Sequence, residues 1–105
     1  FYLCVGKLKV KQKINKKYYV YIVECADGSF YTGYTTDVIR RINEHNYSSR
    51  SAKYTRSRRP VKLLHYEEYD SLSKALKREH AIKKLSRAKK KELIDKTCKW
   101  KLIVL

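Results

Sequence analysis

A tight β-hairpin centred on residues 27 and 28 is the feature that most restricts how this chain can fold. Residues 18–25, YYVYIVEC, are aromatic and β-branched, a composition typical of a strand. Residues 29–34, SFYTGY, predict the antiparallel return strand, because the intervening Asp27-Gly28 pair favours a tight turn. Alternation along the first strand divides its side chains between two faces, with Tyr19, Tyr21 and Val23 on one and Val20 and Ile22 on the other.

A short helix and a third strand are expected after the hairpin. The sequence VIRRINEH, residues 38–45, has helical spacing with Val38 and Ile42 facing inward, and its candidate N-cap residues are Thr35, Thr36 and Asp37. Residues 46–60 predict a loop, because they hold Ser, Asn, Arg and the only proline of the chain. Residues 61–69, VKLLHYEEY, predict the third strand.

A longer helix is expected from a cap at Asp70 or Ser71 to about residue 85. Its predicted buried stripe consists of Leu72, Ala75, Leu76, Ile82 and Ser86. A short basic helix that ends at Leu93 and Ile94 follows it.

These elements predict a single α+β domain over residues 18–94, since a chain of 105 residues has room for one modest core. We expect a three-stranded antiparallel sheet flanked by helices, in the order β-β-α-β-α-α. A basic N-terminal extension covers residues 1–17, and whether it is native is left open. The C-terminal extension, residues 95–105, fits either a strand or an ordered tail.

The charge of the chain is strongly positive and clustered. Lys and Arg number 26 against 10 Asp and Glu, a formal net charge of +16. One cluster lies within residues 7–17, and two others consist of Arg50, Lys53, Arg56, Arg58, Arg59 and Lys62, and of Lys83, Lys84, Arg87, Lys89, Lys90 and Lys91. Such clusters repel one another unless a polyanion neutralises them, which predicts a nucleic-acid partner. The alternative is a surface charged only for solubility. A membrane surface is disfavoured, because no segment joins this charge to a long apolar face.

Cysteine content and hydropathy indicate a reducing, cytoplasmic setting. Cys4, Cys25 and Cys98 are odd in number and contain no CxxC pair, which argues against a disulfide framework and a cysteine zinc site. No run approaches the roughly 18 apolar residues of a membrane-spanning helix, so no membrane partner is expected. The oligomeric state is not readable from the sequence.

Glu79 is the sole acidic residue between Ser71 and Lys91. Helical geometry directs it towards the predicted buried stripe, where an isolated carboxylate costs roughly several kcal/mol unless a cation or a metal compensates. A lone carboxylate suits Mg²⁺, which commonly takes one carboxylate together with waters and substrate phosphate. The alternative is an ordinary surface ion pair with Lys83, four residues further on.

Tyr21 and Tyr31 lie on neighbouring strands and can face one another. Such a pair is commonly packing, and a tyrosine base is handicapped by an ordinary pKa of about 10 unless nearby groups favour the phenolate. Arg41 and His45, one helical turn apart, offer that influence, and the arginine fork also matches phosphate oxygens. Alternatively, Arg41 is a solvated or phosphate-binding arginine and His45 is a partly buried helix histidine. Gly33 marks a bulge or a close approach to the backbone.

Taken together, these residues resemble the GIY-YIG nuclease superfamily. The hairpin carries Tyr-Val-Tyr at 19–21 and Tyr-Thr-Gly at 31–33, followed by Arg41, His45 and Glu79. The chain is most similar to the small single-domain UPF0213 type, which is related to the nuclease domain of a group of structure-specific endonucleases. That similarity spans roughly residues 18–94 in three ordered blocks, VYIVECADGSFYTGYTTDVIRRINEHN, AKYTRSRRPVKLLHYEE and SKALKREHAIKKL.

The resemblance implies a role for each candidate site residue. Tyr21 would be the base that activates water, and Tyr31 would position water and phosphate. Arg41 would stabilise the charged transition state, and His45 would help Tyr21 to lose its proton. Glu79 would be the only carboxylate that binds the metal.

The sequence departs from the superfamily pattern at several positions. Tyr19, Val20 and Thr32 replace the usual motif residues, and no asparagine follows Glu79, unlike in some restriction and homing enzymes of the superfamily. The second departure puts metal geometry and efficiency in doubt. No cysteine-rich zinc module accompanies the domain.

The resulting hypothesis is a metal-dependent endonuclease that uses Mg²⁺ or Mn²⁺ to hydrolyse phosphodiester bonds, with DNA favoured over RNA and structure selectivity undecided. The residues expected to grip nucleic acid are Lys53, Tyr54, Arg56, Arg58, Arg59, Lys83, Lys84 and Arg87. Tyr54 would either stack on an unpaired base or anchor its own loop. One alternative is a nucleic-acid-binding module with this fold and little or no catalysis. Another is a structural protein of a ribonucleoprotein, which gives no reason for Glu79 to interrupt an apolar stripe.

Overall fold

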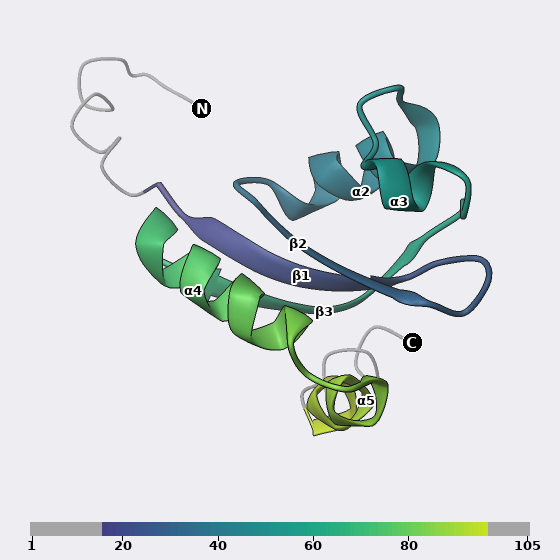
Figure 1. Cartoon of the computed structure of the whole chain (residues 1–105). Helices are drawn as coiled ribbons and strands as arrows, with labels where there is room; N and C mark the ends of the chain where they lie inside the picture. The colour runs from purple at the N-terminus through teal and green to yellow at the C-terminus, as the bar shows by residue number, and fades with distance from the viewer. Residues whose placement is uncertain (1–15, 97–105) are drawn as a thin grey trace, which may run out of the picture.

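The computed structural model describes residues 16–96, which form one three-stranded sheet with helices on both of its faces (Figure 1). The strands are β1 (Tyr18–Glu24), β2 (Phe30–Thr35) and β3 (Lys62–Tyr69). The helices are α2 (Val38–Tyr47), α3 (Lys53–Arg56), α4 (Leu72–Lys83) and α5 (Arg87–Lys96). The α+β class is therefore confirmed, whereas the expectations for residues 1–15 and 97–105 lie outside the described residues. No helix within residues 16–96 is long and apolar enough to cross a membrane.

β1 is the central strand of the sheet, in the order β2-β1-β3, and both of its pairings are antiparallel. The predicted hairpin between β1 and β2 is confirmed. Its turn depends on Gly28, whose φ of 86° lies in the left-handed region that glycine tolerates best. Register places Tyr21 opposite Gly33, and the β1–β3 pairing is shifted between Ile22 and Val23.

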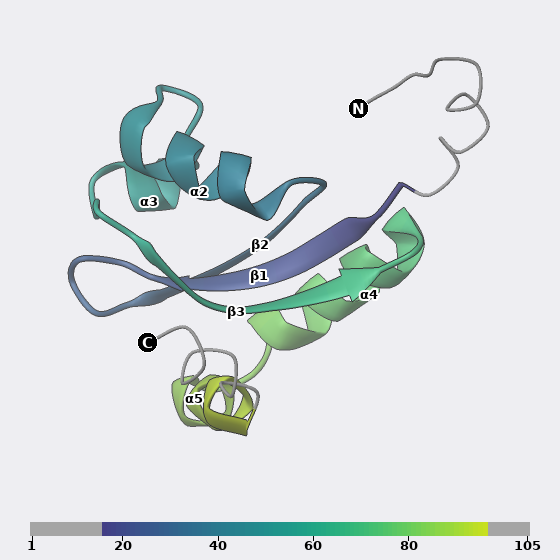
Figure 2. The ribbon, with the colours of Figure 1, turned by 180° about the vertical axis from the view of Figure 1, so that it is seen from behind.

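Each face of β1 belongs to a separate apolar cluster, as strand alternation predicts. Val20 and Ile22 pack with Ala75, Ile82 and Ile94 beneath α4 and α5. Tyr21 and Val23 pack with Cys25 and Val61 on the other face, where Tyr31, Ile42 and Leu63 cover them in part. Figure 2 shows the same layering from behind, with α2 and α3 on one side of the sheet and α4 on the other. Burial of each large apolar side chain contributes about 1.5–3 kcal/mol.

Side-chain caps begin α2 and α4, which lie on opposite faces of the sheet. Asp37 caps α2 by accepting a hydrogen bond of 3.1 Å from the backbone N–H of Arg40, and Ser71 caps α4 by accepting one of 3.2 Å from that of Lys74. Of the residues expected to face inward from α2, Val38 and Ile42 are half-buried. The fully buried residue of that helix is His45.

Two predictions about the helices were wrong. Residues 46–60 are not all loop, because α3 forms a helical turn within them. The inward line of α4 holds Ala75 and Ile82, but Leu72 and Leu76 are 40% and 38% exposed. Leu72 is the first residue of the helix and Leu76 is turned about 100° away from Ala75, so neither lies on the line that contacts the sheet. The helix ends at Lys83, which leaves the exposed Ser86 outside it.

A polar cluster around Glu67 joins β3 to α4. Arg78 donates to both Glu67 carboxylate oxygens, at 2.8 and 3.1 Å, and the Tyr69 hydroxyl donates at 2.6 Å. Nε2 of His65 lies 2.8 Å from the same carboxylate. Burial opposes ionisation, but the hydrogen bonds from these three side chains outweigh it and lower the pKa of Glu67 to about 2. The cluster fixes α4 against the sheet through Arg78, the residue that precedes Glu79.

Candidate active site

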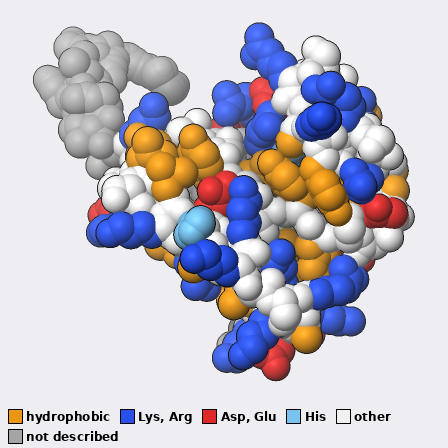
Figure 3. Space-filling view, in the orientation of Figure 1, with side chains coloured by type: hydrophobic (Ala, Val, Ile, Leu, Met, Phe, Trp, Pro, Cys, Tyr) orange, Lys and Arg blue, Asp and Glu red, His pale blue; other side chains and the backbone are white. Residues whose placement is uncertain are grey.

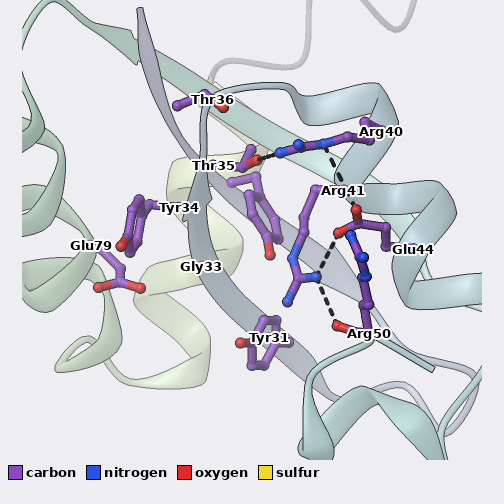
Figure 4. A pocket seen from close by; sticks show the side chains of 11 residues that line it. Tyr31, Gly33, Tyr34, Thr35, Thr36, Arg40, Arg41, Glu44, Arg50 and Glu79 are labelled. Carbon is purple, nitrogen blue, oxygen red and sulfur yellow. Dashed lines mark hydrogen bonds and ion pairs between the residues drawn. The ribbon is translucent and has the colours of Figure 1, made fainter. Parts of the chain in front are cut away.

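A pocket of about 500 Å³ opens at the exposed edge of β2 and brings together residues from both helical layers. Its lining consists of Tyr21, Tyr31, Gly33, Tyr34, Thr35, Thr36, Arg40, Arg41, Glu44, Arg50 and Glu79. Figure 4 shows Arg41 and Tyr31 on one side of β2 and Glu79, which comes from α4, on the other. Four of the five residues singled out in the sequence therefore line one cavity, and the fifth, His45, contacts one of them directly.

Tyr21 and His45 form a buried hydrogen-bonded pair at the base of this pocket. The Tyr21 hydroxyl lies 2.8 Å from Nε2 of His45, and the two residues are 1% and 0% exposed. Burial, reinforced by Tyr31, raises the pKa of Tyr21 to about 12, although Arg41 acts in the opposite direction. Burial and the positive charge of Arg41 lower the pKa of His45 to about 4. At neutral pH the pair is therefore a protonated phenol and a neutral imidazole.

Gly33 provides the space that the Tyr21 ring occupies. A Cβ atom at position 33 would lie 2.6 Å from the Tyr21 hydroxyl oxygen and 2.8 Å from Cζ of the ring. The expected close approach to the backbone at this glycine is thus confirmed. The absence of a side chain lets the phenol lie across β2 towards the pocket.

Arg41 is held in the pocket by two acceptors. One guanidinium nitrogen, Nη1, donates to Oε1 of Glu44 at 2.8 Å and to the backbone oxygen of Arg50 at 2.9 Å. Arg40 lies 3.9 Å from the other oxygen of Glu44. The lining thus contains three arginines and two glutamates, a net positive balance that suits a phosphate group.

Glu79 contributes the carboxylate on the α4 side of the pocket. Its side chain is 16% exposed, and it pairs with Lys83 at 3.5 Å, so the expected ion pair and the pocket position occur together. Residues 16–96 contain no group of three or more His, Cys, Asp or Glu side chains arranged to hold a metal ion. A single carboxylate still fits Mg²⁺ or Mn²⁺ if waters and a substrate phosphate complete the coordination.

Tyr31 is part of an aromatic stack that continues to α3. The Tyr31 and Tyr54 rings are stacked with centroids 6.0 Å apart, and the Arg58 guanidinium lies 4.0 Å from the centre of the Tyr54 ring. The rings of Tyr31 and His45 meet edge to face at 5.5 Å. Tyr54 therefore anchors its segment, which was expected to be a loop and forms α3, to Tyr31; this is one of the two roles considered for it.

The basic residues expected to grip nucleic acid lie in two regions on opposite faces of the sheet. Lys and Arg side chains appear over both regions in Figure 3. Arg56, Arg58 and Arg59 donate hydrogen bonds to backbone oxygens of the α2–α3 region. Among the described residues, Lys53 has no side-chain hydrogen-bond or ion-pair partner. In the other region Lys83 pairs with Glu79, Lys84 follows α4, and Arg87 lies 4.3 Å from the centre of the Phe30 ring.

Several residues that line the pocket or contact His45 were not singled out as site residues from the sequence. Arg40, Glu44 and Arg50 are surface-type residues whose positions relative to Arg41 depend on tertiary structure. Tyr34 follows Gly33, and it was counted only as part of the strand. Thr55, whose Oγ1 lies 2.9 Å from Nδ1 of His45, falls in the segment predicted as loop. Thr55 follows His45 by ten residues, and nothing in the sequence between them predicts that the two side chains meet.

Comparison with known proteins assigns the chain to a family. The profile described as GIY-YIG catalytic domain matches residues 17–92. The chain belongs to the GIY-YIG family. Within this family its relatives are UPF0213 proteins: one from Haloquadratum walsbyi is 57% identical over 82 residues, covering 78% of this chain and 91% of the relative. Another, from Syntrophus aciditrophicus, is 59% identical over 78 residues, covering 74% and 90%.

Two solved structures of similar proteins agree with the fold. The solution structure of a UPF0213 protein from Bacillus halodurans is 49% identical, with a TM-score of 0.52, and the match covers 77% of this chain and 85% of that one. The solution structure of a protein from E. faecalis is 44% identical, with a TM-score of 0.54 and the same coverage. The family implies a nuclease with a nucleic-acid substrate, and GIY-YIG nucleases generally use divalent metals.

Proposed function

We propose that this GIY-YIG protein is a metal-dependent endonuclease that hydrolyses phosphodiester bonds in DNA. The observation that carries the proposal is the shared pocket: a phenol, a guanidinium and a carboxylate from three different elements line one cavity at a sheet edge. Each supplies a different requirement of phosphodiester hydrolysis, namely proton removal from water, charge stabilisation and metal binding. A structural cluster gives no reason to place these three groups around an open cavity.

The buried pair of Tyr21 and His45 supplies the route for the proton of the attacking water. Because the phenol is protonated at neutral pH, Tyr21 can accept a proton from water only as its own proton passes to Nε2 of His45. Water then attacks phosphorus as hydroxide, and the P–O bond to the leaving oxygen breaks. The departing alkoxide takes a proton from bulk water, and His45 carries the positive charge until it releases its own proton. Tyr31, whose ring lies 6.4 Å from that of Tyr21, would orient the water and the phosphate.

Arg41 and Glu79 would divide the charge of the reacting phosphate between them. Arg41 is fixed by Glu44 and by the Arg50 backbone, so its guanidinium needs little reorganisation as negative charge develops on the phosphate oxygens. Glu79 would hold the divalent ion, Mg²⁺ or Mn²⁺, which supplies Lewis-acid polarisation of a phosphate oxygen. With a single carboxylate, tight metal binding would require the substrate.

The test is a cleavage assay on supercoiled plasmid and on linear, flap, hairpin and four-way DNA, with Mg²⁺, Mn²⁺ or EDTA at a stated salt concentration. We expect metal-dependent nicking that Glu79→Ala and Arg41→Ala each abolish while DNA binding persists. The matched control is Glu92→Ala, which removes an exposed carboxylate from α5 and should leave cleavage unchanged. Full activity in both site variants would contradict the proposal, and RNA substrates in the same assay test the choice of DNA.

A DNA-binding module without catalysis is the second candidate function. Two observations favour it: Glu79 is already paired with Lys83, and burial keeps the Tyr21 phenol protonated. This candidate predicts salt-dependent binding but no cleavage with any metal or substrate. It also predicts that Glu79→Ala strengthens binding, because a negative charge leaves a basic surface.

A further inference from the structure

Thr55 is a fully buried polar residue that the sequence did not single out. It lies in the single turn of α3 with 0% exposure, and its Oγ1 is 2.9 Å from Nδ1 of His45. The same oxygen is 3.1 Å from the backbone carbonyl of Ala52, to which the Thr55 hydroxyl donates. His45 is thus contacted on both ring nitrogens, by Tyr21 at Nε2 and by Thr55 at Nδ1.

The donors around this chain of contacts determine where each proton lies. Arg41 lowers the pKa of Tyr21 but its guanidinium can only donate hydrogen bonds, so the phenol proton needs a different acceptor. Within residues 16–96 the acceptor at the Tyr21 hydroxyl is Nε2 of His45. A neutral imidazole that accepts at Nε2 carries its proton on Nδ1 and donates it to Thr55.

Thr55 can accept this hydrogen bond because its own hydroxyl proton is donated elsewhere. A hydroxyl has one proton, and here that proton points to the carbonyl of Ala52, which leaves the Oγ1 lone pairs for Nδ1 of His45. The backbone N–H of Ala52 lies 3.5 Å from the same Nδ1 and can only donate to it, which favours the opposite tautomer, but this contact is longer than the 2.9 Å contact between Nδ1 and Thr55. In this arrangement Tyr21 donates to Nε2 of His45, Nδ1 of His45 donates to Thr55, and Thr55 donates to the carbonyl of Ala52.

We propose that Thr55 is a positioning residue that holds His45 in the Nδ1–H tautomer, so that Nε2 is free to take the Tyr21 proton. The catalytic meaning of this arrangement rests on the proposed function, but the arrangement itself does not. The charged and titratable groups that face His45 are Arg41 and Glu44 on α2, Tyr21 and Tyr31 on the sheet, and Arg59, which donates to the His45 backbone oxygen at 2.6 Å. None of them contacts Nδ1.

The site therefore includes α3, which also carries Lys53 and Tyr54. Tyr54 stacks on Tyr31 from the same helical turn that places Thr55 against His45. The short helix α3 thus contacts both Tyr31, through Tyr54, and His45, through Thr55. This explains why a four-residue helix without an apolar face is packed at this place.

Two substitutions at this position separate the hydroxyl from the shape of the side chain. Thr55→Val keeps the branched shape and removes the hydroxyl, whereas Thr55→Ser keeps the hydroxyl. Thr32→Val is the matched control, because Thr32 is also a buried threonine but its Oγ1 has no partner among the described residues. The readouts are the tautomer of His45, from nitrogen-15 NMR of the ring, and the rate of plasmid nicking against pH.

We expect the Nδ1–H tautomer in the wild type, in Thr55→Ser and in Thr32→Val, and a gain of the Nε2–H tautomer in Thr55→Val. The nicking rate of Thr55→Val should fall about 10- to 100-fold, the range for loss of a group that orients a functional imidazole. Thr55→Ser should recover most of that loss. An Nε2–H tautomer in the wild type, or Thr55→Val with unchanged tautomer and rate, would overturn the proposal.

The two proposals fail in different ways. If the wild-type protein cleaves no substrate, the proposed function fails, whereas the tautomer measurement still decides the role of Thr55. If Thr55→Val does not fold, the wild-type spectrum and Thr55→Ser remain decisive. Loss of the Nδ1–H tautomer in Thr55→Ser would count against the proposal, because that variant retains the hydroxyl.

Discussion

Oη of Tyr21 and Nε2 of His45 are 2.8 Å apart although their residues are separated by 24 positions and are closed off from solvent. A buried polar contact of this kind loses about 1–3 kcal/mol when one partner is removed. The same contact joins β1 to α2, so it contributes both to the fold and to the proposed chemistry. Variants at Tyr21 must therefore be read for stability and for activity separately.

Replacing Tyr21 by Phe should abolish most cleavage with a modest loss of stability. The ring remains in its cavity, but the proton route from water to His45 is interrupted, so we expect the nicking rate to fall by about 100-fold or more. The free energy of unfolding should fall by about 1–3 kcal/mol, because Nε2 of His45 loses its donor. Rates and urea denaturation curves measured on the same preparation check both values.

Tyr19→Phe is the control for Tyr21→Phe. Tyr19 lies two residues away on the same strand and face, and its ring meets that of Tyr66 rather than the pocket. Its rate should stay within about twofold of wild type, as expected for a change outside the reacting groups. Equal losses in the two variants would show that the rate follows general damage to β1.

Gly33→Ala should inactivate the protein by moving Tyr21. The new Cβ would lie 2.6 Å from the hydroxyl oxygen, on a ring that is too buried to move aside freely. Overpacking of this kind costs about 1–3 kcal/mol, and the displaced phenol would lose its alignment with His45. Nicking rates and thermal unfolding measure the two effects.

Gly28→Ala provides the comparison within the same hairpin. It meets no atom within 4 Å, but its φ of 86° strains an alanine by about 1–2 kcal/mol. The two variants should therefore lose similar stability, whereas only Gly33→Ala should lose activity. A Gly33→Ala protein with wild-type nicking would contradict the role given to this glycine.

The parts of the fold that the sequence predicted are those specified by local signals. The turn at Asp27-Gly28 and the strand alternation of Tyr21 and Val20 each depend on neighbouring residues, and both are observed. The role of Gly33 could also be predicted, because a glycine within a strand of aromatic residues indicates a bulge or the close approach of another group to the backbone. The roles of Tyr21, Arg41 and Glu79 came from the family resemblance rather than from these signals.

The parts that the sequence missed depend on tertiary contacts. α3 has no apolar periodicity, and its turn is stabilised by Tyr54 stacking on Tyr31 and by Arg56 and Arg59 donating to nearby backbone oxygens. Leu76 was assigned to the buried stripe because it is apolar. The inward line of α4 is instead fixed partly by the polar contact of Arg78 with Glu67.

Protonation of Glu67 should release α4 from β3 in acid. The pKa of Glu67 is about 2 in the folded protein against 4.5 when unperturbed, so its contribution to stability is present above about pH 4.5 and is lost as pH falls towards 2. Glu67→Gln should lower the free energy of unfolding at pH 7 by about 2–3 kcal/mol, because Arg78 loses its charged partner. Urea denaturation between pH 7 and pH 3 measures the difference.

The difference between Glu67→Gln and wild type should shrink as the pH falls, since the wild-type carboxylate then becomes neutral as well. Asp70→Asn is the control, because Asp70 pairs with Lys74 at 3.2 Å on the exposed surface of the same region. Its free energy of unfolding should stay close to that of wild type at every pH, because an exposed ion pair contributes little to stability. A Glu67→Gln difference that stays constant with pH would argue that shape rather than charge joins the two elements.

Substitutions of Lys53 and Arg59 should separate binding to DNA from maintenance of the fold. Among the described residues Lys53 has no side-chain hydrogen-bond or ion-pair partner, whereas Arg59 donates to the His45 backbone oxygen at 2.6 Å, to Oγ of Ser51 at 2.9 Å and to the Ser48 backbone oxygen. Lys53→Ala should leave the melting temperature unchanged and make the log–log salt dependence of DNA affinity shallower by about 0.9, the value for one released phosphate contact. Arg59→Ala should lower the free energy of unfolding by roughly 2–3 kcal/mol, because hydrogen bonds from a charged donor are lost.

If about five phosphates are contacted, the log–log salt slope of DNA affinity for the wild-type protein should be near −4.5. A Lys53→Ala slope equal to that of wild type would remove this residue from the interface and direct the search to Lys84 and Arg87 on the other face of the sheet.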